Sequence, residues 1–161
     1  MLAVVHVPSP LGDLAVAGDA AGVTRIWLPL EGPPPATTDA PPAVRQAAAQ
    51  VADYLAGCRR TLRVRYGAVR ATAFQRAVWV QIATIAYGEV RTYGEIAAAL
   101  RRPGAARAVG QATGANPWPI AIPCHRVVAA DGPGGFGGGA ALKEFLLHLE
   151  ATRPAPRPAG R

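Results

Sequence analysis

The stretch TYGEIAAALRRPGAARAVGQAT, residues 92–113, decides the fold of the second half of the chain. Thr92 and Glu95 have the spacing of a capping box, which predicts a short helix that begins there. Proline and glycine at 103–104 break this helix, and residues 105–113 predict a second one. Two short helices joined by a tight glycine-containing turn are typical of a helix-turn-helix, although helical hairpins that do not bind DNA share the pattern.

Small side chains line the second helix of this pair: Ala105, Ala106, Ala108, Gly110 and Ala112. A helix that reads base edges needs long polar side chains, so sequence-specific recognition is not expected. Small residues instead allow a helix to approach a groove and bind the DNA backbone by shape. Close packing against another helix would use the same residues, so both interpretations stay open.

The first half of the chain predicts a small sheet and one helix. Short strands are expected at 2–7, 13–17 and 23–28, because apolar runs there are separated by turn residues. After a proline-rich loop, apolar residues recur at helical spacing from Val44 and the helix should end near Gly57. This pattern indicates an antiparallel meander followed by an amphipathic helix.

Further helices are expected around the helix-turn-helix. A capping box at Thr72 predicts a helix of about fourteen residues, which stops at Tyr87-Gly88, and apolar spacing predicts a last helix that ends at Glu150. We therefore expect an α/β N-terminal domain, a small antiparallel sheet plus helix, followed by a mainly α C-terminal domain with a winged-helix-like helix-turn-helix. The expected boundaries are 1–66 and 67–153, with a disordered tail at 154–161.

The composition indicates a protein that folds without disulfides or metal and that binds an anion. With 161 residues, 50% of them hydrophobic, the chain can bury a core, and its two cysteines lack the spacing of a zinc site. The net charge is +7, and all but one of the 17 basic residues are arginine, which favours phosphate. An arginine excess can also reflect nucleotide composition alone. No signal peptide or membrane span is apparent, which predicts a cytoplasmic protein.

Pro123-Cys124-His125-Arg126-Val127 is the most reactive-looking segment of the chain. A neighbouring imidazole is a common means of activating a thiol, and the prolines around this segment restrict its backbone. An inert buried cysteine is the plain alternative, because free cysteine is among the most buried residue types. The glycine-rich segment 131–139 follows, either as a loop that passes close to a ligand or as flexible filler.

Five ordered motifs between Thr72 and Glu150 together resemble the O6-alkylguanine-DNA alkyltransferases, the methylated-DNA-protein-cysteine methyltransferases. They are Tyr93-Gly94-Glu95-Ile96-Ala97, the segment 105–110, Asn116-Pro117, the segment 123–128, and the glycine-rich loop leading to Lys143-Glu144. The first 66 residues fit that family only in layout. The resemblance implies direct-reversal DNA repair, in which the protein takes the alkyl group of O6-alkylguanine onto its own cysteine.

The same resemblance assigns the catalytic roles. Cys124 matches the alkyl acceptor, and His125 matches the base that draws off its proton through a water molecule. Glu150 would orient and charge-balance that histidine, while Asn116 matches the residue that braces the turn. Because the resulting thioether has no evident means of release, the protein would act once, without a metal or a cofactor.

The family's DNA contacts and substrate pocket are carried over in the same way. Tyr93 matches the hydroxyl that assists nucleotide rotation and donates toward the leaving guanine, and Arg107 matches the finger that replaces the extruded base. Further DNA contacts are expected from Ala105, Ala106, Gly110 and Arg126, and further pocket contacts from Pro119, Val127, Phe136 and Gly137. Phe136 and Gly137 stand where relatives often carry tyrosine and serine. At Phe136 the ring can stack on guanine but a hydroxyl contact is lost, and at Gly137 a hydrogen bond to the base is left to backbone amides.

The expected partner is double-stranded DNA that contains O6-alkylguanine, with O4-alkylthymine as a second candidate substrate. We expect a monomer in the bacterial cytosol or nucleoid, with cooperative DNA binding as an open alternative. A non-catalytic sensor of damaged DNA is a rival, but such relatives lack a nucleophile where Cys124 stands. A Cys/His hydrolase fits the adjacent pair poorly, and a plain helix-turn-helix regulator leaves the cysteine motif unexplained.

Overall fold

The N-terminal part of the computed structural model, which describes residues 2–152, is a three-stranded antiparallel sheet with one helix. Strands β1 (Ala3–Val7), β2 (Leu14–Asp19) and β3 (Gly22–Trp27) lie in the order β1-β2-β3. The predicted meander is therefore confirmed. Gly22 has a φ of 151°, and a side chain there would meet the backbone of residues 65–67, so the tight turn before β3 requires glycine.

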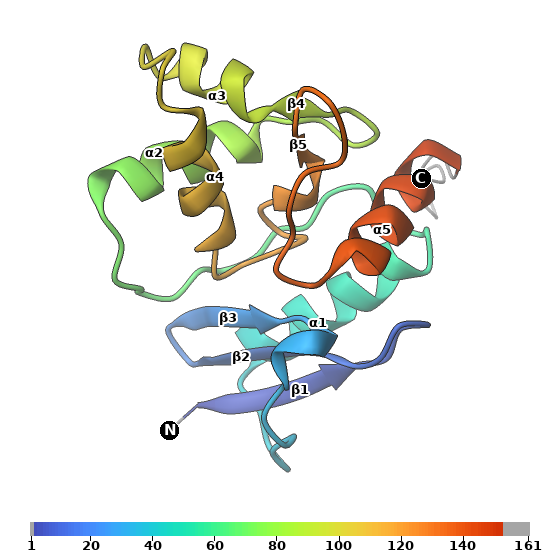
Figure 1. The fold of residues 1–161 in the computed structure, drawn as a ribbon. Helices are drawn as coiled ribbons and strands as arrows, with labels where there is room; N and C mark the ends of the chain where they lie inside the picture. The colour runs from blue at the N-terminus through green and yellow to red at the C-terminus, as the bar shows by residue number, and fades with distance from the viewer. Residues whose placement is uncertain (1, 153–161) are drawn as a thin grey trace, which may run out of the picture.

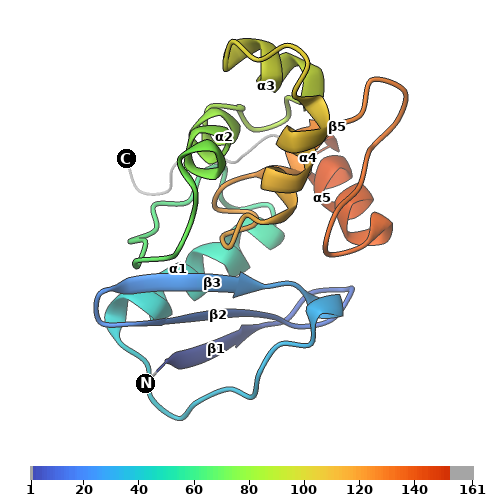
Figure 2. The same ribbon diagram turned by 60° about the vertical axis from the view of Figure 1, so that its left-hand side comes forward.

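Helix α1 (Pro42–Leu55) packs against this sheet, chiefly against β1 and β2. Proline occupies the first helical position, where its missing N–H leaves no hydrogen bond unmade. Val44, Ala48 and Val51, which recur at the predicted helical spacing, are buried, and so are Ala47 and Tyr54. Leu55, the last apolar residue of the predicted spacing, is only partly buried. Figures 1 and 2 show the β3 edge of the sheet turned toward the helices of the C-terminal part.

The C-terminal part contains helices α2 (Ala73–Ala83), α3 (Tyr93–Ala99), α4 (Ala106–Gly114) and α5 (Ala140–Thr152). Both predicted capping boxes are present, and the Thr72 and Thr92 hydroxyls accept the expected backbone N–H groups. The prediction for the end of α2 was wrong. The backbone changes to 3-10 hydrogen bonding there, because Thr84 N donates to Gln81 O and Ile85 N donates to Ile82 O. Helix α2 is therefore shorter than predicted, although Ile85 is still buried.

Four further short elements were not predicted. Strands β4 (Arg91–Thr92) and β5 (Val127–Val128) pair in parallel and join the start of α3 to the segment after the cysteine motif. Short 3-10 helices occur at η1 (Pro29–Glu31) and η2 (Cys124–Arg126). The pairing of β4 with β5 brings the helix-turn-helix and the cysteine motif together.

The two parts of the chain share one continuous cluster of buried apolar residues. Along the β3 edge, Ile26 N donates to Pro117 O at 2.8 Å, and Trp118 Nε1 donates to Val23 O at 2.8 Å. The Trp118 ring also contacts Trp79. The boundary at residue 66 stays a prediction, and the predicted disordered tail lies outside the described residues. No helix within residues 2–152 has the length and apolar character needed to cross a membrane.

Candidate functional site

A cavity of about 260 Å³ lies where the helix-turn-helix, the cysteine motif, the glycine-rich loop and η1 meet. Its lining residues are Leu28, Glu31, Tyr93, Gly110, Thr113, Gly114, Asn116, Pro119, Cys124, Gly135, Phe136 and Gly137. The predicted pocket residues Tyr93, Pro119, Phe136 and Gly137 therefore lie together around the cysteine. Val127 is fully buried in the core and does not line the cavity, so its pocket contact stays a prediction.

Asn116 braces the chain that leads to Cys124. Its side-chain Nδ2 donates to Ile122 O at 2.8 Å, and its Oδ1 accepts from Trp118 N at 3.0 Å. Between these contacts, Ile120 has a φ of 72°, which a β-branched residue rarely adopts. Two side-chain hydrogen bonds thus hold a strained turn that places the thiol on the cavity wall.

The Cys124 thiol is protonated at neutral pH in this structure. Cys124 is only 6% exposed, and burial raises the pKa of its thiol to about 11. Contact with Asn116 and the charge of Lys143 act in the opposite direction but do not outweigh burial. A base must therefore remove the proton before or during any attack by the sulfur.

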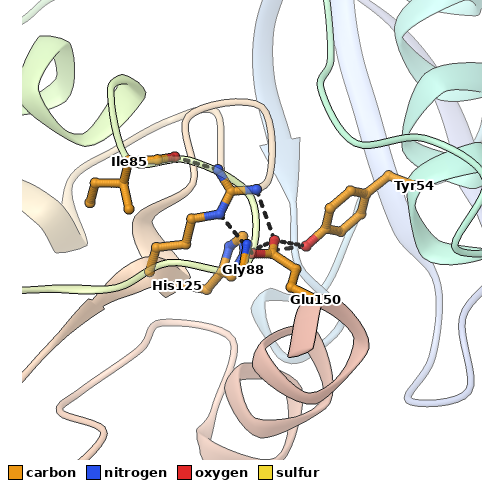
Figure 3. A network of polar contacts seen from close by, with 6 residues as sticks. Tyr54, Ile85, Gly88, His125 and Glu150 are labelled. Atoms are coloured by element: carbon orange, nitrogen blue, oxygen red, sulfur yellow. Dashed lines mark hydrogen bonds and ion pairs between the residues drawn. The ribbon is translucent and has the colours of Figure 1, made fainter. Parts of the chain in front are cut away.

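His125 follows the cysteine directly in sequence, and the 3-10 turn at η2 places its side chain inside a buried polar network (Figure 3). His125 Nε2 lies 2.7 Å from Glu150 Oε2, and both side chains are almost completely buried. Tyr54 OH donates to the same oxygen, and Gly88 N donates to Glu150 Oε1 at 3.0 Å. Figure 3 shows Tyr54, His125 and Gly88 converging on the carboxylate.

Arg126 completes this network, which corrects its predicted role as a DNA contact. Its Nε and Nη2 donate to the two oxygens of Glu150 at 2.8 and 2.9 Å, and its Nη1 donates to Ile85 O at 2.6 Å. The side chain is only 7% exposed. A guanidinium that is buried and engaged through all three nitrogens is not available to a phosphate.

The network sets the protonation of both His125 and Glu150. Burial alone would raise the pKa of Glu150, but hydrogen bonds from His125 and Arg126 hold that pKa well below its ordinary value. Burial lowers the pKa of His125 despite the nearby carboxylate, and the charge of Arg126 acts in the same direction. His125 is therefore a neutral imidazole at pH 7, able to accept a proton.

Nδ1 of His125 is the free end of the imidazole. It is buried, and no group within residues 2–152 lies in hydrogen-bonding range of it. Since Nε2 faces the ionised Glu150, Nε2 carries the proton and Nδ1 keeps its lone pair. The nitrogen that can accept a proton is thus Nδ1, which makes no hydrogen bond to the described residues.

The glycine-rich loop is a close-packed wall of the cavity. Gly134 has a φ of 77°, and a Cβ atom there would lie 2.8 Å from the Tyr93 hydroxyl oxygen. Tyr93 OH donates to Gly135 O at 3.4 Å, and the buried Lys143 donates to the same carbonyl at 3.1 Å. A Cβ atom at Gly138 would lie 2.8 Å from side-chain atoms of Leu28 and Leu142, which would have to shift. Of the two interpretations of segment 131–139, this packing favours a loop that passes close to a ligand over a flexible spacer.

The predicted DNA contacts lie at the start of α4. Arg107 is exposed there, Ala105 and Ala106 are partly exposed, and Gly110 reaches the cavity from the next turn. Their roles toward DNA stay predictions. The geometry shows that the exposed face of α4 and the thiol border one cavity.

Sequence reasoning missed three residues of the site. Tyr54 belongs to α1 and Glu31 to η1, so they reach the site from the N-terminal part, far away in the sequence. Lys143, the one lysine, is buried with its Nζ on Val127 O at 2.6 Å. A lone lysine on the apolar face of an amphipathic helix was the available signal, because such a position is seldom charged.

Comparison with known proteins finds related sequences over most of the chain. Residues 73–152 match the family described as 6-O-methylguanine DNA methyltransferase, DNA binding domain. The chain is 42% identical over 151 residues to the methylated-DNA–protein-cysteine methyltransferase of Mycobacterium tuberculosis, with 91% of each protein covered. It is 39% identical over 150 residues to that of Methanosarcina acetivorans, with 89% of this chain and 95% of the relative covered.

Solved structures agree with the sequences. The crystal structure of the Mycobacterium tuberculosis O6-methylguanine methyltransferase matches with a TM-score of 0.83 and 42% identity, covering 99% of this chain and 96% of that one. The structure of Mycobacterium tuberculosis OGT in complex with DNA matches with a TM-score of 0.81 and 40% identity, covering 96% and 94% of the two chains. The similarity therefore includes both the N-terminal and the C-terminal part.

Proposed function

Because this chain belongs to the methylated-DNA–protein-cysteine methyltransferase family, we propose that it repairs O6-alkylguanine in double-stranded DNA by transferring the alkyl group to Cys124. The observation that carries this proposal is a thiol on the wall of a cavity, backed by a buried neutral histidine. A volume of about 260 Å³ suits one extruded base with a small alkyl group. O4-alkylthymine is a second candidate substrate.

The target carbon is inaccessible within stacked DNA, so the base has to be extruded into the cavity. Extrusion costs a few kcal/mol, and the exposed Arg107 would offset part of this cost by entering the vacated space. The small residues Ala105, Ala106 and Gly110 would let α4 approach the DNA closely. Tyr93, on the cavity wall, would assist the rotation of the nucleotide.

Transfer then follows from the chemistry of the site. The Cys124 thiol gives its proton, through one water molecule, to Nδ1 of His125, and the sulfur attacks the alkyl carbon. The bond between that carbon and O6 breaks, and its electron pair leaves with guanine. The Tyr93 hydroxyl, which burial keeps protonated by raising its pKa, donates a proton to the departing base. It regains a proton from solvent, to which the His125 imidazolium releases the one taken from Cys124. The product is a thioether, so each molecule acts once.

The other expectations follow the same proposal. The protein would act as a monomer, with no cofactor, where chromosomal DNA lies in the bacterial cytosol or nucleoid. Residues 1–66 would form the support domain and 67–153 the DNA-binding and alkyl-acceptor domain. Because residues of both parts share one hydrophobic cluster, residues 1–66 would stabilise the C-terminal domain.

The decisive experiment is an intact mass measurement after incubation with a duplex that contains O6-methylguanine. We expect a gain of one methylene mass in the wild type and in Cys58→Ser, and no gain in Cys124→Ser. Cys58 is the other cysteine and is exposed, which makes it the matched control. Tight binding without a gain in mass would identify the protein as a non-catalytic sensor of damaged DNA.

A further inference from the structure

Tyr54 brings a hydroxyl from the N-terminal part of the chain into the buried network. It lies in the last turn of α1 and is fully buried. Its hydroxyl donates to Glu150 Oε2 and lies 3.2 Å from His125 Nε2 (Figure 3). The Tyr54 phenol therefore contacts both the proposed base, His125, and Glu150, the residue that orients this base.

The proton positions around this hydroxyl follow from its neighbours. The single proton of Tyr54 points at Glu150, so the lone pairs of its oxygen face His125 Nε2. Nε2 therefore lies between two oxygen acceptors, the phenol and the carboxylate. This arrangement is satisfied only when Nε2 carries the proton, and the basic lone pair is then on Nδ1.

The phenol keeps this arrangement over the whole working range of pH. Burial, and then the neighbouring Glu150 carboxylate, raise the pKa of Tyr54 far above its ordinary value. Tyr54 consequently remains a donor to Glu150 and never competes with it as a second anion.

We propose that Tyr54 is a positioning residue of the alkyl transfer, which fixes the tautomer of His125 with Nδ1 as the base. The proposal rests on the function proposed above, and it gives the N-terminal part a direct share in the chemistry. Without the hydroxyl, Glu150 loses a donor and Nε2 loses one of its two oxygen neighbours. Glu150 then holds Nε2 alone, so the imidazole populates the other tautomer to a greater extent, or tilts away from the geometry that serves the thiol.

The conservative variant Tyr54→Phe tests this role because it removes the hydroxyl alone. The ring contacts Tyr87 edge to face, with centroids 6.2 Å apart, and His125 with centroids 6.3 Å apart, and phenylalanine keeps both contacts. Tyr66→Phe is the matched control, because Tyr66 is 41% exposed and its ring packs on Trp118, away from the network.

Two measurements are needed. The first is the single-turnover rate constant of methyl transfer from an O6-methylguanine duplex, with the dissociation constant for DNA measured separately. Because a hydrogen bond to a charged group is lost, Tyr54→Phe should lower the rate constant between about tenfold and a hundredfold with DNA affinity unchanged. Tyr66→Phe should match the wild type.

The second measurement is the ¹⁵N chemical shifts of the imidazole nitrogens, which report the tautomer directly. The chain has three histidines, so the spectrum is simple to assign. We expect the wild type to hold a proton on His125 Nε2, and Tyr54→Phe to show shifts averaged between the two tautomers. The wild-type tautomer tests whether Nδ1 is the basic atom, and the change in Tyr54→Phe tests the share that Tyr54 has in fixing it.

A proton on Nδ1 in the wild type would overturn the proposal, as would a Tyr54→Phe rate constant within twofold of the wild type. These failures are distinct from failure of the proposed function. If the wild type itself gains no methyl group, the alkyl transfer is wrong. If the wild type transfers and Tyr54→Phe equals it, Tyr54 alone is wrong.

Discussion

Replacing Glu150 with glutamine keeps the shape of the side chain and removes the charge at the centre of the network. Oε2 accepts from Tyr54, His125 and Arg126, and Oε1 accepts from Arg126 and Gly88. Whichever oxygen becomes an amide NH₂, at least two donors then face a donor. Arg126 is also left buried without its counterion.

The cost follows from these losses. Removing one partner of a buried ion pair costs about 3–5 kcal/mol, a large share of the roughly 5–15 kcal/mol that stabilises a folded protein. At about 2–4 °C per kcal/mol for a chain of this size, the melting temperature should fall by about 6–20 °C. Thermal and urea unfolding, followed by circular dichroism, measure this change.

Glu144→Gln is the matched control, because Glu144 is exposed on the same helix and its replacement should cost less than about 0.5 kcal/mol. The pKa of Glu150 is lowered in the folded state, so its stabilising contribution is complete above the unfolded value of about 4.3 and is lost as the pH falls below it. The difference between wild type and Glu150→Gln should therefore shrink in acid. A loss under about 1 kcal/mol at pH 7, or a difference independent of pH, would refute the reasoning.

Two further predictions concern the DNA face and the loop. Arg107→Ala should slow transfer from duplex DNA by roughly tenfold or more while leaving transfer from a free alkylguanine base unchanged, since only the duplex requires extrusion; equal losses in the two rate assays would remove the finger role. Gly134→Ala should impair transfer, because its Cβ would strike the Tyr93 hydroxyl at a positive φ, whereas Gly132→Ala, which is in the same loop but does not line the cavity, has open space and should be tolerated. Indistinguishable rates for these two loop variants would contradict the close packing.

Local patterns predicted most of the fold. The capping boxes at Thr72 and Thr92 marked the starts of α2 and α3, because both partners of a capping box lie within one helical turn. The apolar spacing after Val44 gave the buried face of α1 for the same reason. Where the end of α2 depended on a change of turn type rather than on a breaker residue, the prediction was wrong.

The site needed information that no local pattern contains. Tyr54 and Glu150 meet across 96 positions of sequence, so only the packing of α1 against α5 reveals their contact. Arg126 was assigned to DNA as part of the family resemblance, but the η2 turn directs it inward onto Glu150. The family resemblance assigned Cys124, His125 and Glu150, but it did not indicate that Tyr54 and Arg126 also bind the carboxylate of Glu150.

The network explains how a cysteine that reacts only once stays unreacted until its substrate binds. Burial raises the pKa of Cys124 to about 11, so the resting thiol is protonated and a poor nucleophile toward small electrophiles. Burial lowers the pKa of His125, and because Arg126 neutralises Glu150, the carboxylate orients the imidazole without keeping it protonated. Thiol and base therefore both rest neutral. On the proposed function, the charge separation between them is needed only while the sulfur attacks, when an extruded base fills the cavity and excludes water from it.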